Sequence, residues 1–584
     1  NYPPGKENLG KASYLDVFAS LVRILNALKE RGYRIGDIPD AHEIKKIFLD
    51  RGLVNSVGFP FKLQEIKYLL RVSLDKYLSW FNELPDKVKE RIIKDWGEPP
   101  GSSMVIDNEI IIPGIILGNI FIGVQPSRGI HENPSKIYHS RDLSPHHQYV
   151  AFYKWIRKEF KADAIIHLGT HGTLEFLPGK ELGLSKYCFP DILIDDLPNI
   201  YIYHVINSSE AAIAKRRSYA LIINHMSPPL MISDVHGEFA ELERLLREYY
   251  ERLQYGDQKL EAIEDKILKI AQKYDLGESI DEIHDKIFEY KRSLVPKGLY
   301  IIGNNLSKDE LINYLTYVAR YDRGSVKSLH RLISESMSVD YDHILENPSE
   351  IIKDGKCGAE FFQEIENIVK EIIESYLFEG IDLQELFSKK GLKVNIKEIR
   401  KVLAFLQEIK NNVEASDEIT SVLEALEGKY ILPGPGGDSV RNPNVYPTGR
   451  NTFQLDPTNL PTQIAMERGE KIAEEYIQQY FRKYGRYPKV ISVVLWGFET
   501  MKTGGETLAA IFRLLGVRPK WKSIYIRELE VIPLSELGRP RIDVVVTICG
   551  IFRDTFYNLV ELLDRAFKLV ANLNEPLDMN YIRA

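Results

Sequence analysis

Histidine is concentrated in one segment of this chain. Nine of its 13 histidines lie between His131 and His236, although the chain has 584 residues. A neutral imidazole binds metal ions and accepts protons near neutral pH, so the segment is a candidate for either kind of chemistry. Any one of these histidines could equally be an ordinary core or surface residue, but the concentration as a whole favours a functional role.

The sequence HLGTHGTLEFLPGK, residues 167–180, groups such side chains most closely. His167 ends an apolar run, and His171 and Glu175 follow among glycines. On a helix the four-residue spacing would put His171 and Glu175 on one face, but the glycines favour a loop at the carboxyl end of a strand, where α/β sheets bind ligands. Imidazole and carboxylate suit a divalent metal, or removal of a proton from a nitrogen acid. The alternative is a glycine turn that the glutamate caps.

Charged groups that could bind an acidic substrate flank this stretch. The segment SSEAAIAKRR ends in three cations, Lys215, Arg216 and Arg217. At a helix end they either stabilise the helix dipole or bind carboxylates. Further polar residues come just before the site, namely Arg128, His146 and His147. Similar loops recur near the end of the chain, with Arg450, with Glu499 and Thr500, and with Arg553 and Asp554, and each of these alone is typical of a solvated turn.

The elements that must position these residues alternate between strand and helix. Residues 11–98 have helical periodicity, with an apolar stripe in the segment LVRILNALKERGY. From about 103 to 235 short apolar runs follow one another. IILG and NIFIGV predict two strands that meet near Gly118. YVAFYKWIRKEF predicts a helix, and DAIIHLG, IYIYHVI and YALIINH predict strands. This alternation indicates α/β architecture with a partly parallel sheet.

The rest of the chain divides into a helical and a second alternating part. Residues 237–428 form long amphipathic patterns, and a Gly/Pro-rich loop follows near 430. A helix at 463–484, a strand VISVVLW, a helix after Gly505 and a strand DVVVTI come next. We therefore expect a multidomain α/β protein with large helical blocks. The expected domains are a mainly helical segment at 1–100, a His-rich α/β core at 101–236, a helical domain or insertion at 237–428, and a second α/β domain at 429–584.

Composition excludes several classes of protein. The formal net charge of −7 argues against a generally basic nucleic-acid binder. The three cysteines form no CxxC pair, which argues against a disulfide framework or a zinc ribbon, and reduced thiols fit the cytoplasm. The most apolar segment, at 109–124, is interrupted by Pro and Gly, and no signal peptide is visible. The first residues, NYPPGKENLG, read as the inside of a larger protein.

One near-match to a phosphate-binding loop carries no weight. Residues 5–12, GKENLGKA, approach the pattern GxxxxGK[ST], but Ala12 replaces the hydroxyl residue that would hold magnesium. Tyr2, Pro3 and Pro4 precede it in place of a strand. We therefore expect no ATP binding in this chain.

Seven motifs, taken in their order, resemble the large subunit of the class I metal chelatases, the family of the CobN subunit of cobaltochelatase and the H subunit of magnesium chelatase. They are QPSRG, PHHQYVAFYKWI, DAIIHLGTHGTLEFLPGKELGLS, LPNIYIYHVINSSEAAIAKRRSYALIINHMSPP, PGGDSVRNPNVYPTGRN, LWGFETMKTGGE and LGRPRIDVVVTICGIFRDTFYNL. The resemblance covers nearly the whole chain. Large subunits of this family are longer, and the chain is similar to their central portion.

The resemblance implies a ligase that forms nitrogen–metal bonds by inserting a metal into a tetrapyrrole. In such enzymes the large subunit binds the ring, and separate AAA+ subunits hydrolyse ATP. The segment HGTLEFLPGK then implies Glu175 as base or ligand and His171 as ligand or proton relay, with His167 as a third catalytic candidate. The expected substrate-binding residues are Arg128, His146, His147, Lys180, Arg216, Arg217, Arg450, Glu499, Thr500, Arg553 and Asp554.

The sequence leaves alternatives open for the identity of the inserted metal and for the role of the chain. Histidine richness favours cobalt, destined for a corrin-type ring in cobalamin biosynthesis, over magnesium, which prefers oxygen ligands. Insertion of magnesium into protoporphyrin IX is the first alternative, and a non-catalytic tetrapyrrole carrier is the second. A metal-dependent hydrolase would fit the histidines but would explain none of the motifs near the end of the chain. We expect neither a nucleic-acid partner nor a membrane span.

Overall fold

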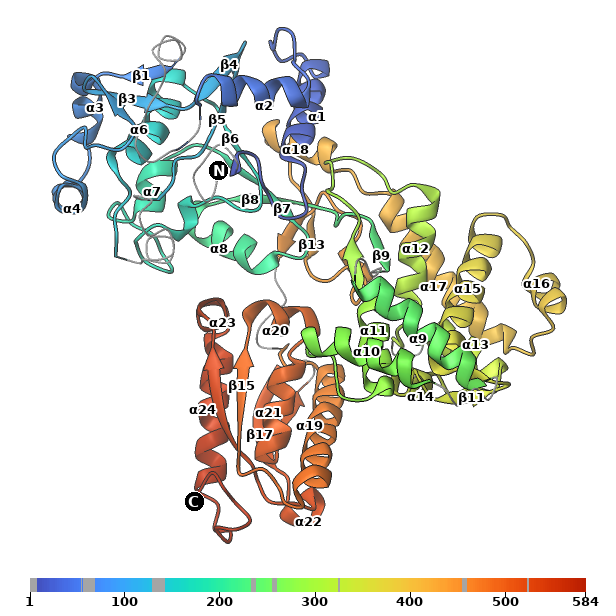
Figure 1. The fold of residues 1–584 in the computed structure, drawn as a ribbon. Helices are drawn as coiled ribbons and strands as arrows, with labels where there is room; N and C mark the ends of the chain where they lie inside the picture. Colours follow the sequence, from blue (N-terminus) through green and yellow to red (C-terminus); the bar gives the residue numbers. More distant parts are fainter. Residues whose placement is uncertain are drawn as a thin grey trace. The chain divides into compact units, whose positions relative to one another are not determined.

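The computed structural model describes residues 8–53, 55, 69–128, 142–232, 238–254, 260–323, 326–453, 459–522 and 525–583. The chain divides into two compact units, which are described separately (Figure 1). Unit 1 comprises Asn1–Ser13, Val17–His225 and Glu418–Ala584, and unit 2 comprises Tyr14–Asp16 and Met226–Asp417. Both contain helices and strands, so the expected mixed α/β class is confirmed. The four domain ranges expected from the sequence stay a prediction.

The first part of unit 1 is mostly helical. Its elements are α1 (Val17–Glu30), α2 (Ala41–Asp50), β1 (Leu70–Val72), α3 (Leu74–Phe81), α4 (Asp86–Trp96), β2 (Val105–Ile106), β3 (Glu109–Ile112), β4 (Gly114–Leu117) and β5 (Ile120–Gly123). The expected pair of strands around Gly118 is the antiparallel hairpin β4–β5. A Cβ atom at Gly118 would lie 2.0 Å from the Arg34 carbonyl oxygen, so this turn requires glycine.

Helix α6 (His147–Trp155) continues as the π-helical turn η3 (Ile156–Phe160) and is buried along its whole length. Tyr149 and Phe152 of this helix share one core with Tyr77 of α3 and Ile112 of β3. This core fixes the helix that leads into the next strand, β6 (Ile165–Leu168).

A three-stranded parallel sheet carries the histidine-rich part of unit 1. Its strand order is β6-β7-β8, with β7 at Asn199–His204 and β8 at Leu221–His225. The connections contain η4 (Leu174–Phe176), α7 (Phe189–Ile194) and α8 (Ser208–Ser218). The partly parallel sheet expected from the alternating pattern is therefore confirmed. The carboxyl ends of its three strands lie at one edge, where the following loops begin.

The last part of unit 1 is a second parallel α/β arrangement. Its elements are α18 (Glu418–Leu426), β13 (Pro433–Pro435), η5 (Pro443–Val445), β14 (Asn451–Phe453), α19 (Gln463–Tyr484), β15 (Val490–Leu495), α20 (Gly497–Thr503), α21 (Glu506–Leu515), β16 (Val517–Lys522), β17 (Tyr525–Val531), α22 (Leu534–Leu537), β18 (Asp543–Ile548), α23 (Gly550–Thr555) and α24 (Tyr557–Ala571). Strands β15 and β18 pair in parallel and pack with α19, α21 and α24 around one hydrophobic core (Figure 1).

Unit 2 is dominated by helices. Its elements are β9 (Leu230–Ile232), α9 (Glu238–Gln254), α10 (Glu261–Lys273), α11 (Ile280–Arg292), β10 (Leu294–Pro296), α12 (Lys308–Val318), α13 (Leu329–Ser336), α14 (Tyr341–Glu346), β11 (Ile351–Lys353), β12 (Lys356–Cys357), α15 (Gly358–Leu377), α16 (Leu383–Lys390) and α17 (Ile396–Glu414). Local sequence fixes several of the helix starts. Ser307 and Glu310, for example, form a capping box at the start of α12. The helical character expected for this stretch is confirmed.

Candidate functional site

The loop after β6 carries the three residues that the sequence singles out. His167 lies in β6, His171 follows in the loop, and Glu175 lies in the short helix η4. The loop passes so close to β7 that a Cβ atom at Gly172 would lie 2.2 Å from the Tyr201 hydroxyl. The glycine therefore permits the close approach, and the expected loop at a strand end is confirmed.

Glu175 is a fully buried carboxylate held by two tyrosines. Its relative exposure is 0%. Tyr201 donates a hydrogen bond of 2.7 Å to one carboxylate oxygen, and Tyr203 donates one of 2.8 Å to the other. Burial raises the pKa of Glu175, while the nearby His171 and the two tyrosine hydrogen bonds oppose this rise. A carboxylate with a raised pKa is a stronger base than an exposed one, so the site contains a proton acceptor.

His171 lies beside Glu175 and is accessible to solvent. Its side chain is 17% exposed. Its Nδ1 lies 2.6 Å from the Gly172 carbonyl oxygen, which can only accept, so Nδ1 carries a proton and donates it to this oxygen. Nε2 in turn lies 3.9 Å from a carboxylate oxygen of Glu210, in the first turn of α8.

His167 is held in one tautomer within the sheet. Its Nδ1 donates to the Asn199 side-chain oxygen at 2.9 Å, and its Nε2 accepts from the Tyr153 hydroxyl at 3.1 Å. Its ring stacks on that of Tyr201 with centroids 4.2 Å apart. Burial lowers the pKa of His167 to about 4, so the ring is neutral near pH 7. These contacts give His167 the role of positioning Tyr201, which holds Glu175.

Gln125 ties this loop to α6. Its side-chain NH₂ donates to the Tyr153 hydroxyl at 2.7 Å, and its side-chain oxygen accepts from the Thr173 backbone N–H at 3.0 Å. The Thr173 hydroxyl lies 2.7 Å from the Tyr149 hydroxyl. The loop before Glu175 is thus fixed on both sides by partly buried hydrogen bonds, which restrict the position of the carboxylate.

The expected substrate-binding histidines lie in the core. His146 caps α6, because its Nδ1 accepts from the Tyr149 backbone N–H at 3.2 Å. His147 accepts from the Tyr77 hydroxyl at 2.8 Å and donates to the Gly97 carbonyl oxygen at 2.9 Å. Both side chains are 1% exposed. Their contacts position α6, and substrate contact would require this core to open.

The expected cations differ in their exposure. Arg128 is buried, and its charge lowers the pKa of Tyr149, although burial raises that pKa overall. Arg217 is buried and donates to the Leu177 carbonyl oxygen at 2.6 Å, two residues beyond Glu175. Arg216 is half-buried, and Lys180 is exposed. Arg217 thus supports the loop that carries Glu175, whereas the Lys180 side chain is exposed.

The expected residues near the end of the chain lie on two further parts of unit 1. The Arg450 backbone N–H donates to the Asn224 side-chain oxygen at 2.8 Å, so this loop contacts β8. Glu499 and Thr500 lie in α20, and each has a buried oxygen with no hydrogen-bond partner among the described residues. Arg553 is exposed on α23. Asp554 belongs to the same helix, but its side chain lies outside the described part.

Residues from the two α/β parts of unit 1 meet at one point. The Ser208 hydroxyl at the start of α8 lies 3.9 Å from the Met501 sulfur in α20. A Cβ atom at Gly436 would lie 2.6 Å from the Ser208 Cβ. The glycine-rich loop that contains Gly436 therefore also packs against the start of α8. The structure therefore brings α20 next to α8, and α8 carries Glu210.

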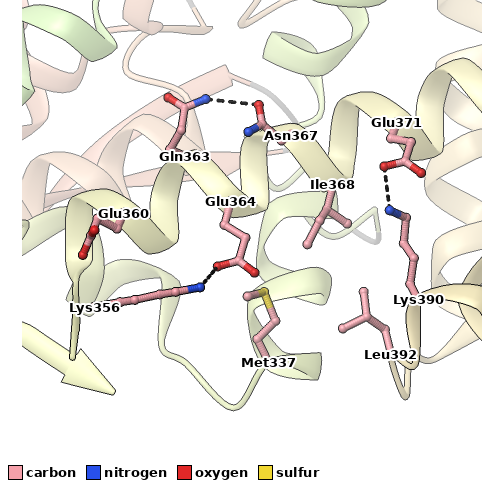
Figure 2. Close-up of a pocket in the computed structure, with 10 residues that line it drawn as sticks. All are labelled: Met337, Lys356, Glu360, Gln363, Glu364, Asn367, Ile368, Glu371, Lys390 and Leu392. Carbon is pink, nitrogen blue, oxygen red and sulfur yellow. Dashed lines mark hydrogen bonds and ion pairs between the residues drawn. The ribbon is translucent and has the colours of Figure 1, made fainter. Parts of the chain in front are cut away.

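Other candidate sites are less suitable. A surface hollow of about 620 Å³ in unit 2 is lined by Met337, Lys356, Glu360, Gln363, Glu364, Asn367, Ile368, Glu371, Lys390 and Leu392 (Figure 2). Lining residues of this hollow form ion pairs with one another, such as Lys356–Glu364 at 2.8 Å, so part of their charge is already neutralised. Within the described ranges no group of three or more His, Cys, Asp or Glu side chains could hold a metal ion. His131, His139 and His236 of the histidine-rich segment lie outside these ranges.

The two tyrosines that hold Glu175 are not among the site residues expected from the sequence. The signal was present, because Tyr201 and Tyr203 are two residues apart in a strand and so point to the same face. Gln125 and Glu210 were also missed, and no local pattern marks them. Tertiary packing brings both residues to the site. Gln125 contacts Thr173, which lies 48 residues later in the chain, and Glu210 lies near His171, which is 39 residues earlier.

The fold and site define a class of α/β proteins with acid–base groups at the carboxyl edge of a parallel sheet. Comparison with known proteins identifies the family within this class. The family model described as CobN/Magnesium Chelatase matches residues 1–584, and the chain belongs to that family. No helix of the described ranges is both long and apolar enough to cross a membrane.

Individual relatives agree with this assignment. An uncharacterized protein of Methanocaldococcus jannaschii is 42% identical over 605 residues, which cover 100% of this chain and 48% of the relative. The chloroplastic magnesium-chelatase subunit ChlH of Oryza sativa subsp. indica is 34% identical over 632 residues, covering 100% of this chain and 44% of ChlH. The solved catalytic subunit of cobaltochelatase from Mycobacterium tuberculosis has a TM-score of 0.81 and 33% identity, covering 98% of this chain and 49% of that chain. The chain therefore spans about half the length of the relatives it matches.

Proposed function

We propose that this chain forms the ring-binding core of a chelatase that inserts a divalent metal ion into a tetrapyrrole. Membership of the CobN/magnesium chelatase family supports the reaction class. The single observation that carries the proposal is the buried Glu175 carboxylate, which two tyrosines hold at the carboxyl edge of the β6-β7-β8 sheet.

The reaction needs a base, because two inner N–H protons leave the ring as the metal enters. Glu175 is suited to accept a proton, since burial raises its pKa. His171 is partly exposed beside it and serves as proton relay or as metal ligand. His167 is neutral and acts through its contacts with Tyr201. Because protons are released, insertion falls at acid pH.

The ring carries carboxylates and flat apolar faces. Lys180, Arg216, Arg450 and Arg553 are the expected cations that the described part leaves at least partly exposed, so they are the first candidates for its carboxylates. Arg128, Arg217, His146 and His147 instead support the site from the core. Glu499 and Thr500 add buried oxygens on α20.

Cobalt is the metal that we favour, with a corrin-type ring as its acceptor. The imidazole next to the carboxylates suits cobalt better than magnesium, which prefers oxygen ligands. The chain is 34% identical to ChlH and 33% identical to the cobaltochelatase subunit, so similarity does not distinguish the two metals. Magnesium insertion into protoporphyrin IX is therefore the second candidate. We further propose that separate AAA+ ATPase subunits bind ATP and drive the reaction.

Metal insertion by the purified protein at its natural length tests this function directly. The protein is mixed with its ATPase subunits and ATP, and Co²⁺ and Mg²⁺ are each offered with a corrin-type ring and with protoporphyrin IX. We expect ATP-dependent insertion of Co²⁺ into the corrin-type ring. Preferred insertion of Mg²⁺ into protoporphyrin IX would select the second candidate. Ring binding without insertion of either metal would show a carrier and contradict the proposal.

A further inference from the structure

Glu210 is the accessible carboxylate of the site, although no sequence motif singles it out. Its side chain is 16% exposed, whereas Glu175 is completely buried and both of its oxygens accept hydrogen bonds from tyrosines. A hydrated metal ion that arrives from solvent meets Glu210 before it can reach Glu175. The two carboxylates therefore suit different tasks.

A capping role does not explain the position of Glu210. It is the third residue of α8, where a glutamate often accepts from the backbone N–H of the N-cap residue. Here the N-cap residue is Asn207, and its backbone N–H donates to the His204 carbonyl oxygen at 2.8 Å. Glu210 instead accepts from the Asn207 side-chain NH₂ at 2.7 Å. This contact orients Glu210 without closing a capping box.

His171 presents the matching group. Its Nδ1 proton is bound to the Gly172 carbonyl oxygen, so Nε2 is the nitrogen through which the neutral ring can bind a metal ion, and this atom lies 3.9 Å from a Glu210 oxygen. A backbone carbonyl that accepts from one imidazole nitrogen is the usual support of a histidine that binds metal through the other nitrogen. Metal–ligand bonds of about 2.1 Å to nitrogen and oxygen allow one ion to contact both atoms across this gap.

We propose that His171 and Glu210 together form the docking site for the divalent metal substrate, with Asn207 as the positioning residue of Glu210. The proposal rests on the chelatase function proposed above. The Asn207 side-chain oxygen is buried and has no hydrogen-bond partner among the described residues, so it offers a further acceptor for a water molecule on the metal. Glu175 then remains the proton acceptor behind the pair.

A site with two protein ligands suits a metal that must be released. No third His, Cys, Asp or Glu joins the pair within the described ranges. Resident structural metals normally have four protein ligands, whereas open sites keep positions for water or substrate. Ring nitrogens can therefore replace the water ligands of the metal while His171 and Glu210 still hold it. The positive end of the α8 dipole at Glu210 further weakens cation binding and favours release.

Cobalt binding without ring or ATP tests the pair independently of insertion. Co²⁺ is titrated into the purified protein at its natural length, and binding is followed through the visible d–d absorption of the ion. Co²⁺ binds nitrogen and oxygen ligands more tightly than Mg²⁺ does, so the probe serves for either physiological metal. We expect saturable binding in the wild type, and a dissociation constant larger by about 10- to 100-fold in both Glu210→Gln and His171→Ala.

A control variant tests whether the effect is specific to this pair. Glu109→Gln removes a carboxylate from a partly exposed ion pair with Arg71, at 3.0 Å, and should bind Co²⁺ as the wild type does. Glu210→Gln keeps an oxygen that can accept from Asn207, so folding should survive, and circular dichroism checks this.

Unchanged Co²⁺ affinity in folded Glu210→Gln, or no saturable binding in the wild type, would overturn the proposal. The expected weaker Co²⁺ binding in Glu210→Gln, combined with failure of the wild type to insert metal, would instead contradict the proposed function. The proposed metal site at His171 and Glu210 would then still be supported.

Discussion

Glu175 is a carboxyl group with no exposed surface, and its two tyrosine partners make this burial possible. Tyr201 and Tyr203 replace the hydration of both carboxylate oxygens with fixed hydrogen bonds. Such preorganised donors lower the cost of burying the charge, but burial still raises the pKa of Glu175. The residue therefore holds a proton more tightly than an exposed glutamate, which suits a group that must accept one.

The same burial predicts an effect on stability. Because the pKa of Glu175 is raised in the folded state, its stabilising contribution is present at low pH and is lost as pH rises from the ordinary carboxyl value through the raised one. Glutamine is neutral at every pH. Glu175→Gln should therefore gain free energy of unfolding relative to the wild type as pH rises across this window. Urea denaturation of both proteins at a series of pH values measures this gain, and parallel pH profiles would contradict it.

Part of the site could be predicted from residue types alone. The glycines between His167 and Glu175 indicated the loop, and the apolar run before them indicated the strand. The burial of His147 could not be predicted, because its ring contacts Tyr77 and Gly97, which lie 70 and 50 residues earlier. Pairings such as that of His171 with Glu210 arise only when the sheet brings separate loops to one edge.

Among the elements of unit 2, α12, α13 and α15 are joined by a buried ionic cluster. Arg320 lies just after α12, and its guanidinium is 2.8 Å from Glu366 on α15. His330 on α13 contacts the other oxygen of Glu366, also at 2.8 Å. Burial alone would raise the pKa of Glu366, but His330 and Arg320 outweigh it and bring this pKa to about 2. The cluster therefore stabilises the packing of these helices while Glu366 is ionised.

Glu366→Gln should lower the free energy of unfolding of unit 2 by about 3–5 kcal/mol at neutral pH, because it leaves the buried Arg320 guanidinium without its carboxylate. In the wild type this stabilisation is present above the ordinary pKa of 4.5 and is lost as pH falls towards 2. Hydrogen exchange in α13 and α15 measures the effect. Glu364→Gln on the same helix removes an exposed partner of Lys356 and should change stability by less than about 1 kcal/mol. Equal effects of both substitutions would contradict this account.

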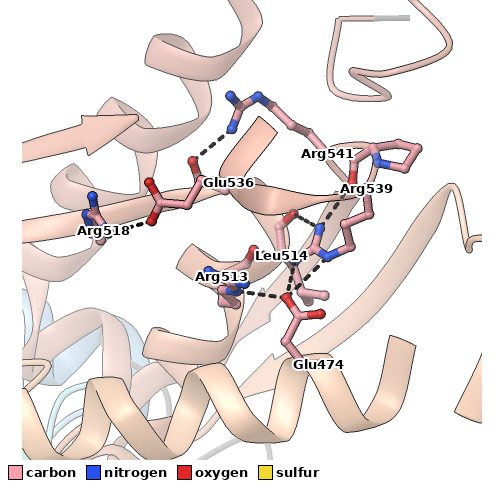
Figure 3. Close-up of polar contacts among 9 residues, drawn as sticks. Glu474, Arg513, Leu514, Arg518, Glu536, Arg539 and Arg541 are labelled. Carbon is pink, nitrogen blue, oxygen red and sulfur yellow. Dashed lines mark hydrogen bonds and ion pairs between the residues drawn. The ribbon is translucent and has the colours of Figure 1, made fainter. Parts of the chain in front are cut away.

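In the second α/β part of unit 1, buried arginines connect the end of α21 to β18. Figure 3 shows Glu474 of α19 between Arg513 and Arg539, at 2.7 and 3.1 Å. Arg541 is 0% exposed, and it donates to Glu575 at 2.8 Å and to the Gly516 carbonyl oxygen at 2.8 Å. These contacts satisfy carbonyl groups at the helix end that the helix itself leaves open.

Arg541→Met should therefore destabilise this part by about 3–5 kcal/mol, because Glu575 loses its cation and several buried carbonyl groups lose their donor. Arg518→Met is the matched control, since Arg518 is 40% exposed and binds Glu536 at the surface at 2.8 Å. Its effect should stay within about 1 kcal/mol. Thermal unfolding compares the two variants, and a similar fall in both would contradict the role of Arg541.

Most elements follow from the periodicity of the sequence. The helix expected at 463–484 is α19, with the same bounds, since Thr462 caps its start and Gly485 ends it in a left-handed conformation. Apolar runs predict strands β15 and β18, but they do not predict that these two strands pair with each other. β15 ends at Leu495 and β18 begins at Asp543, and 47 residues lie between them. Which strands pair depends on how α19, α21 and α24 pack, and local patterns do not contain this information.

For the molecule as a whole, we predict that this chain does not hydrolyse ATP. Its near-match to a phosphate-binding loop ends in Ala12, and the first part of that segment lies outside the described residues. The purified protein without its ATPase subunits should show no steady-state hydrolysis above background. A rate of about 1 s⁻¹, within the usual range for enzymes, would contradict this prediction and the division of labour that we propose.

Ring binding should involve both α/β parts of unit 1, because α20 meets α8 beside the site. We predict that a bound tetrapyrrole contacts residues within 128–225 and within 434–554. A structure of the protein with a bound ring checks this, and contacts confined to 237–428 would contradict it.

The insertion rate of Glu175→Gln, measured with ATPase subunits, ATP and increasing metal concentration, shows whether Glu175 is the base of the reaction. The substitution keeps the size of the side chain and removes its basicity. We predict unchanged ring affinity and a loss of insertion of about 10²- to 10⁴-fold that extra metal does not restore, which is the usual contribution of a general base. Recovery at high metal concentration would make Glu175 a metal ligand. A normal insertion rate would remove Glu175 from the mechanism and contradict the account.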